Sequence, residues 1–123
     1  MSTEPAQHLT IDVIDDGDAV VLVVAGELDP LSGPDLTRAM EAALASSRTA
    51  VVLDLADVGF IDSSGLRTLL EAHTRAQELG SDLILRRPSP AARRLLDITD
   101  LTSVFSILED GDADRATFGD DAC

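Results

Sequence analysis

Residues 58–67 read Val58-Gly59-Phe60-Ile61-Asp62-Ser63-Ser64-Gly65-Leu66-Arg67, and they follow an apolar run from Ala50 to Leu55. The run predicts a buried strand, the residues after it predict a turn, and a helical pattern starts at Leu66. A serine at such a junction is expected to cap the helix, because its oxygen can accept a free backbone N–H. The same N–H groups and the helix dipole favour an anion there.

Strands and helices alternate along the rest of the chain. Leu9, Ile11 and Val13 predict a half-buried strand, and the apolar residues 19–25 predict a second strand inside the sheet, joined to the first as a hairpin by the turn at 15–18. Further elements are expected as helices after Ser32, from Leu66 to Gly80 and after Ser89, and as short strands at 83–85 and 104–108. In the third helix, Ala92, Leu95, Leu96 and Ile98 are expected to face inward.

This order of elements predicts one α/β domain with a mixed four- to five-stranded sheet and about four helices. The fourth helix is expected to be short and to start near Asp112. We expect the domain to span residues 9–118, between a disordered lead at 1–8 and a disordered acidic tail at 119–123.

The charge of the chain restricts its partners. The net charge is −14, with 23 acidic residues against 9 basic ones, which disfavours nucleic acid and anionic membranes as partners. No apolar run approaches the ~20 residues of a membrane-spanning helix. The single cysteine, Cys123, and a start without a secretory signal pattern fit a cytoplasmic protein.

Signatures of enzymes and of cofactor sites are missing from the sequence. There is no phosphate-binding glycine-rich loop, and Ser63 does not lie in a GxSxG motif. His8 and His73 are far apart and do not form a zinc site with Cys123. His73 is expected to be a packed histidine, and no metal or cofactor is expected.

Two groups of charged residues leave alternatives open. Asp29 and Asp62 could share a surface. An acid–base pair formed by them is a weaker interpretation than two carboxylates without a catalytic role. Four of the arginines lie close together in the sequence: Arg86, Arg87, Arg93 and Arg94. We expect them to form ion pairs with the surrounding acids, and the alternative is a patch that docks a partner or contacts a phosphate.

Four motifs together resemble the STAS domain, and more narrowly the stand-alone anti-sigma factor antagonists of bacteria. They are the segments 26–29 (GELD), 51–55 (VVLDL), 60–66 (FIDSSGL) and 90–96 (PAARRLL). The resemblance extends from about Leu9 to Phe118. It implies a small domain without catalysis that binds an anti-sigma factor, itself a serine kinase, and so frees a sigma factor for transcription.

The resemblance also implies a switch. The kinase phosphorylates the first serine of the motif, which corresponds to Ser63, and a phosphoserine phosphatase reverses the modification. Periodicity alone does not choose between the two serines. The expected partner-binding residues are Asp29, Asp62, Ser64, Gly65, Leu66 and Arg67. Arg67 is also expected to pair with the phosphate, since it follows Ser63 by four residues.

Two other functions remain open at this stage. The same fold could serve as an unphosphorylated scaffold subunit of a lipid-transport or stress-signalling complex. A nucleotide-binding or nucleotide-hydrolysing protein is the least supported interpretation, because the sequence has no phosphate-binding loop.

Overall fold

The structure is a computed structural model, and it describes residues 9–46 and 49–109. Within this part of the chain the elements are β1 (Thr10–Asp16), β2 (Ala19–Leu28), α1 (Gly33–Leu44), β3 (Ala50–Ile61), α2 (Ser63–Leu79), β4 (Asp82–Arg86), α3 (Pro90–Ile98) and β5 (Ser106–Leu108). The predicted α/β class and mixed sheet are confirmed, with five strands and three helices among the described residues. The predicted fourth helix near Asp112, the lead at 1–8 and the tail at 119–123 lie outside the described residues.

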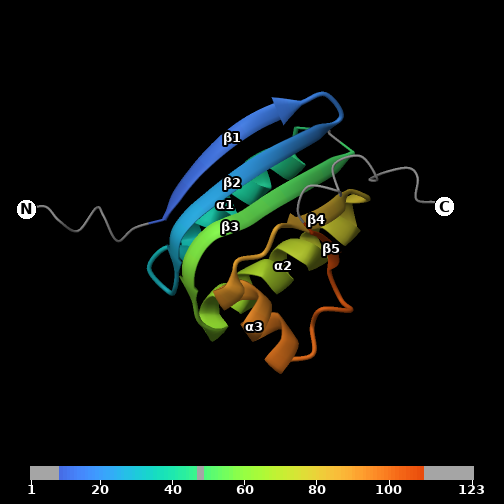
Figure 1. The fold of residues 1–123 in the computed structure, drawn as a ribbon. Helices are drawn as coiled ribbons and strands as arrows, with labels where there is room; N and C mark the ends of the chain where they lie inside the picture. The colour runs from blue at the N-terminus through green and yellow to red at the C-terminus, as the bar shows by residue number, and fades with distance from the viewer. Residues whose placement is uncertain (1–8, 47–48, 110–123) are drawn as a thin grey trace, which may run out of the picture.

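The sheet has the strand order β1-β2-β3-β4-β5 (Figure 1). β1 and β2 form the predicted antiparallel hairpin, whereas the other neighbouring pairs are parallel. A parallel pair needs a crossover connection, and α1, α2 and α3 supply the three crossovers. The carboxyl ends of β2 and β3 therefore meet at one end of the sheet, where α1 and α2 begin.

The core lies between the sheet and the helices. Alternate side chains of the inner strands face the helices because the side-chain period of a strand is two. Strand residues of this core include Val20, Leu22, Val24, Val51, Leu53, Leu55, Leu83 and Leu85. They pack with helix residues that include Leu36, Met40, Leu69 and Leu96. The predicted position of the second strand inside the sheet is confirmed.

The strands β2 and β3 are longer than predicted, and the predicted turn after Leu55 is wrong. β3 continues to Ile61, where it pairs with Leu28 of β2. The register shifts twice along this pair, between Val23 and Ala25 and again after Gly26. These irregularities interrupt the alternation of apolar and polar residues, so the pattern does not reveal the strand beyond Leu55.

The helix ends match the sequence in part. Gly80 ends α2 in the left-handed region at φ 72°, as predicted. In α3, Ala92 and Leu96 are buried, but the expectation that Ile98 faces inward is wrong, since its side chain is 69% exposed. The helix ends at that residue, beyond the core-facing turn. The last strand begins at Ser106 rather than at 104.

Gly65 of α2 lies tightly against the end of β2. A Cβ atom at this position would lie 2.7 Å from the Leu28 carbonyl oxygen and 2.9 Å from the Ile61 side chain. Real Cβ atoms do not come this close to a backbone oxygen, so only glycine lets the first turn of α2 rest on the end of the sheet. Gly59 in β3 is different, because a Cβ atom there would meet nothing within 4 Å.

Gly65→Ala should therefore lower the free energy of unfolding by about 1–3 kcal/mol, the usual cost of forcing extra atoms into a packed site. Urea denaturation measures this change. The matched control is Gly59→Ala, which should change the free energy of unfolding by less than about 0.5 kcal/mol. Equal stabilities of the two variants would contradict the packing of α2 against Leu28.

Candidate functional site

Asp62 caps α2, and its carboxylate organises the start of the helix. Its Oδ1 accepts the backbone N–H of Ser64 at 3.0 Å and that of Gly65 at 3.1 Å. The Ser64 hydroxyl donates to the same oxygen at 2.6 Å. Asp62 has the extended backbone of an N-cap residue, and the helix begins at Ser63. The expectations that a serine caps this helix and that the helix begins at Leu66 are therefore wrong.

These hydrogen bonds stabilise the charged form of Asp62. The hydrogen bond from the Ser64 hydroxyl is the largest cause that lowers the pKa of Asp62 below its ordinary value, and the N–H groups of Gly65 and Ser64 add to it. Partial burial acts in the opposite direction and is outweighed. The anion expected at this helix terminus is thus the carboxylate of Asp62 itself.

The two serines differ in what their hydroxyls do. Ser63 is exposed, and its hydroxyl has no hydrogen-bond partner among residues 9–46 and 49–109. Ser64 is half-buried, and its hydroxyl is bound to Asp62. A carboxylate with a lowered pKa is a weak base, so Asp62 is poorly suited to activate Ser64 as a nucleophile. The exposed hydroxyl that another protein can reach directly is that of Ser63.

Arg67 lies on the exposed side of α2, one turn after Ser63. Its Nε lies 3.4 Å from Glu71 Oε2, and the two side chains are 77% and 64% exposed. Such an exposed ion pair contributes between about 0 and 1 kcal/mol. Arg67 can therefore exchange Glu71 for another anion at little cost.

Two residues of the motif face inward. Gly65 is buried against the end of β2, and the Leu66 side chain is only 6% exposed. Leu66 belongs to the hydrophobic core. These two residues hold the start of α2 in place, whereas Ser63 and Arg67 present their side chains to solvent.

Asp29 organises a second turn, which joins β2 to α1. Its Oδ1 accepts the backbone N–H groups of Leu31 and Ser32, both at 3.0 Å. The buried Ser32 hydroxyl lies 2.7 Å from the Glu27 carbonyl oxygen, to which it donates, and it accepts the Asp29 N–H at 3.0 Å. The Asp29 carboxylate is thus engaged with its own turn, and the hydrogen bonds give no support to an acid–base pair with Asp62.

The two turns lie side by side at one end of the sheet (Figure 1). The backbone N–H of Asp62 lies 3.4 Å from the Leu28 carbonyl oxygen, just before the 29–32 turn. Just after it, a Cβ atom on Gly33 would lie 2.9 Å from the Thr68 hydroxyl oxygen on α2. The structure thus brings Asp29 and Asp62 to one end of the sheet, which the sequence had left open.

Two exposed apolar residues of this end were not among the predicted site residues. Leu31, in the 29–32 turn, is 86% exposed, and Phe60, three residues before Ser63, is 46% exposed. The sequence carried one signal for Leu31. It lies in Pro30-Leu31-Ser32-Gly33-Pro34, among turn-forming residues, where the fold does not require a large apolar side chain.

The arginine cluster is largely paired. Asp54 is buried, and its Oδ2 accepts hydrogen bonds from Arg86 at 3.0 Å and Arg87 at 2.6 Å. Burial raises the pKa of Asp54, but hydrogen bonds from Arg87, the Ala56 N–H and Arg86 outweigh it, so the pKa lies below its ordinary value. Arg93 pairs with Glu109. The expected ion pairing is confirmed for three of the four arginines.

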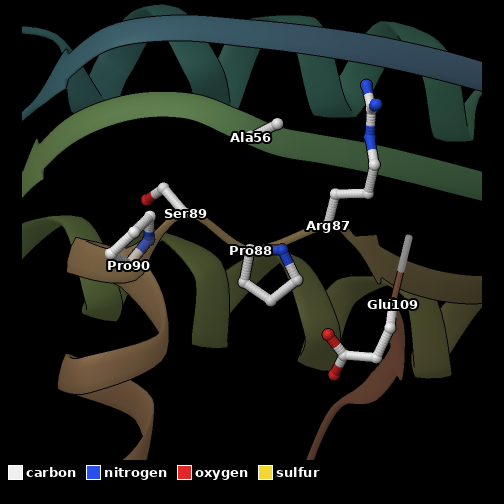
Figure 2. Close-up of a pocket in the computed structure, with 6 residues that line it drawn as sticks. All are labelled: Ala56, Arg87, Pro88, Ser89, Pro90 and Glu109. Carbon is white, nitrogen blue, oxygen red and sulfur yellow. The ribbon is translucent and has the colours of Figure 1, made fainter. Parts of the chain in front are cut away.

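Next to this cluster is an open hollow of about 470 Å³ at the start of α3. Figure 2 shows its lining, which consists of Ala56, Arg87, Pro88, Ser89, Pro90 and Glu109. The Ser89 hydroxyl oxygen already accepts the Ala92 N–H as the cap of α3. Since Ser89, Arg87 and Glu109 are each bound to protein groups, the hollow does not present an unused set of groups for an anion.

His73 is a packed residue, as expected. Its ring lies edge-on to Phe105, with centroids 5.4 Å apart. Among residues 9–46 and 49–109, no group of three or more histidine, cysteine or acidic side chains could hold a metal ion. In the same part of the chain no helix is both long enough and apolar enough to cross a membrane.

Asp62→Ala should lower the free energy of unfolding at pH 7 by about 0.5–2 kcal/mol, the usual cost of losing an N-cap. Because the folded-state pKa of Asp62 is lowered, its contribution is present above the unfolded value of about 3.9 and is lost as the pH falls through the folded value. The difference from the wild-type protein should therefore shrink below about pH 4, as measured by urea denaturation across pH.

The matched control for this measurement is Asp62→Asn, whose side-chain oxygen can accept the same two N–H groups without a charge. It should keep most of the stability at pH 7. An Asp62→Ala variant as stable as the wild-type protein at pH 7 would contradict the role of Asp62 as the cap.

The chain is similar to known proteins of one family. The model of the family described as "Mlab, STAS domain" matches residues 11–109. The anti-sigma-B factor antagonist of Listeria monocytogenes is 30% identical over 92 residues, which cover 75% of this chain and 81% of the relative.

Solved structures agree with this assignment. An anti-sigma factor antagonist from Mycobacterium paratuberculosis has a TM-score of 0.70 and 32% identity, over 87% of this chain and 89% of that one. The phosphorylated form of the Bacillus cell fate determinant SpoIIAA has a TM-score of 0.66 and 22% identity, over 87% and 99%, and shares the fold. The chain is a member of the STAS-domain family of anti-sigma factor antagonists, which are regulators and not enzymes.

Proposed function

We propose that this protein binds an anti-sigma factor that is also a serine kinase, and that phosphorylation of Ser63 releases it. In the unmodified state the protein occupies the anti-sigma factor, so that a sigma factor is free for transcription in the cytoplasm. A phosphoserine phosphatase restores the unmodified state. The single observation that carries the proposal is the Ser63 hydroxyl, which is exposed beside the Asp62 cap and has no hydrogen-bond partner in the described part of the chain.

The contact surface follows from the same geometry. Ser63 and Arg67 are exposed at this end of the sheet, and the half-buried Asp29 lies beside them in the 29–32 turn. Asp62 and Ser64 fix the backbone from which Ser63 projects, while Gly65 and Leu66 anchor that backbone to the core. In this proposal the partner recognises the unmodified shape of this end.

Release needs only a local effect. A kinase that modifies Ser63 must bring the γ-phosphate of ATP to its hydroxyl, so that after transfer the phosphoserine stands beside the phosphates of ADP. Two like charges about 4 Å apart repel by about 4 kcal/mol at an effective dielectric constant near 20. A hundredfold loss of affinity needs only about 2.7 kcal/mol. No refolding is required.

The fold should tolerate the phosphate. It adds a charge of about −1.5 to −2 in the first turn of α2, where the helix dipole contributes a favourable ~0.3–1 kcal/mol. Asp62 opposes it, since two like charges about 4 Å apart in water repel by roughly 1 kcal/mol. Both effects are small against a typical stability of about 5–15 kcal/mol. Phosphorylation therefore changes the surface and leaves the domain folded.

The alternative is a scaffold subunit that uses this fold without phosphorylation. The Listeria monocytogenes and Mycobacterium paratuberculosis relatives, at 30% and 32% identity, are named as anti-sigma factor antagonists, which favours the switch. Purification of the protein with its bound partners distinguishes the two functions. A small ATP-binding kinase supports the switch, whereas a transporter ATPase or an oligomeric signalling shell supports the scaffold.

Incubation with ATP and an anti-sigma factor kinase from the same genome should add one phosphate to the wild-type protein and to Ser64→Ala, but none to Ser63→Ala. The physical reason is that only the Ser63 hydroxyl is exposed and unbonded among the two serines. Intact mass measures the outcome. A phosphate that persists on Ser63→Ala and disappears on Ser64→Ala would overturn the assignment.

Arg67→Ala should move the 31P titration midpoint of the phosphoserine to higher pH, because the arginine one turn away favours the dianion. Glu71→Ala is the matched control. It removes the residue that holds Arg67 and should move the midpoint to lower pH. Unchanged midpoints in both variants would show that Arg67 does not contact the phosphate.

A further inference from the structure

Leu31 packs against little in the part of the chain that the structure describes. Leu31 is 86% exposed, the highest value among the large apolar residues within 9–46 and 49–109. It lies in a turn between β2 and α1, where solvent-exposed polar residues are the norm. Covering a large apolar side chain with another protein surface removes it from water and lowers the free energy of the system.

The turn that carries Leu31 is held rigidly. The Asp29 Oδ1 accepts the N–H groups of Leu31 and Ser32, and the Gly33 N–H donates to the Asp29 carbonyl oxygen at 2.9 Å. The Ser32 hydroxyl ties the turn to Glu27 of β2. A side chain on such a prearranged turn loses little entropy on binding, which is the property of an interface anchor.

Leu31 also lies on the surface that presents Ser63. The 29–32 turn is flanked by Leu28, whose carbonyl oxygen lies 3.4 Å from the Asp62 N–H, and by Gly33, which packs against Thr68. Both flanking contacts are with the first two turns of α2 or its cap. A protein that covers Ser63 therefore meets the Leu31 turn as well.

Charge restricts what can cover this end. Glu27 is exposed and Asp29 and Asp62 are half-buried here, while Arg67 is already paired with Glu71. A second copy of the chain would bring carboxylates against carboxylates at a net charge of −14 each. The complementary surface is an apolar recess with a basic rim.

Resting on the proposed function, we propose that Leu31 is the apolar anchor of this surface and inserts into a basic-rimmed recess of the anti-sigma factor kinase. Asp29 is a positioning residue in this arrangement. It acts through the turn that holds Leu31, and its charge is not the feature that the kinase reads.

The test measures the affinity of the full chain for the ADP-loaded kinase that phosphorylates Ser63. Leu31→Ala should weaken binding roughly tenfold or more, with an unchanged melting temperature, whereas Leu31→Met should bind like the wild-type protein. The matched control is Leu79→Ala, an exposed leucine 47% accessible at the far end of α2, about 24 Å from Ser63 at 1.5 Å per residue. It should leave the affinity unchanged.

A double-mutant cycle tests the positioning role. Asp29→Ala should weaken binding in the wild-type background but add little to Leu31→Ala, and Asp29→Asn, which keeps the accepting oxygen, should restore most of the affinity. A wild-type protein that binds no kinase would overturn the proposed function. If the wild-type protein binds and Leu31→Ala binds equally well, or Leu79→Ala loses as much affinity, the anchor is overturned and the proposed function stands.

Discussion

One oxygen atom, Oδ1 of Asp62, determines the form of the functional end of this protein. It accepts two backbone N–H groups and one hydroxyl, and all three belong to Ser64 and Gly65. This arrangement starts α2 and draws Ser64 inward. The Ser63 side chain is left outside the hydrogen-bond network, on the surface. The Ser63 hydroxyl is thus exposed because the neighbouring Asp62, and not Ser63 itself, caps the helix.

The sheet topology supplies the second turn of the same surface. Parallel strands β2 and β3 end side by side, so the 29–32 turn and the start of α2 are brought together by the register of Leu28 with Ile61. Gly65 makes the approach possible, since any Cβ atom would meet the Leu28 carbonyl oxygen. Each turn is closed by an aspartate that accepts backbone N–H groups. The two aspartates of the sequence motifs therefore act first on the backbone.

Much of this could be predicted from the sequence. The spacing of apolar residues predicted the fold class, the hairpin and the order of strands and helices along the chain. Gly80 predicted the end of α2. The ends of β2 and β3 could not be predicted, because bulges break the period of two. The identity of the cap could not be read either, since Asp62 and both serines are all good N-cap residues. Leu31 was not predicted as a site residue, because its exposure results from the conformation of the turn that Asp29 closes.

The central claim is that a phosphate on Ser63 sets the affinity of a preformed surface without changing the fold. The most direct test compares the unmodified protein with the enzymatically phosphorylated protein in titrations against the ADP-loaded kinase, and compares their 1H–15N spectra. The account predicts an affinity about a hundredfold lower or more for the phosphorylated form, with shift changes confined to the start of α2 and the 29–32 turn. Equal affinities, or shift changes spread across the sheet, would contradict it.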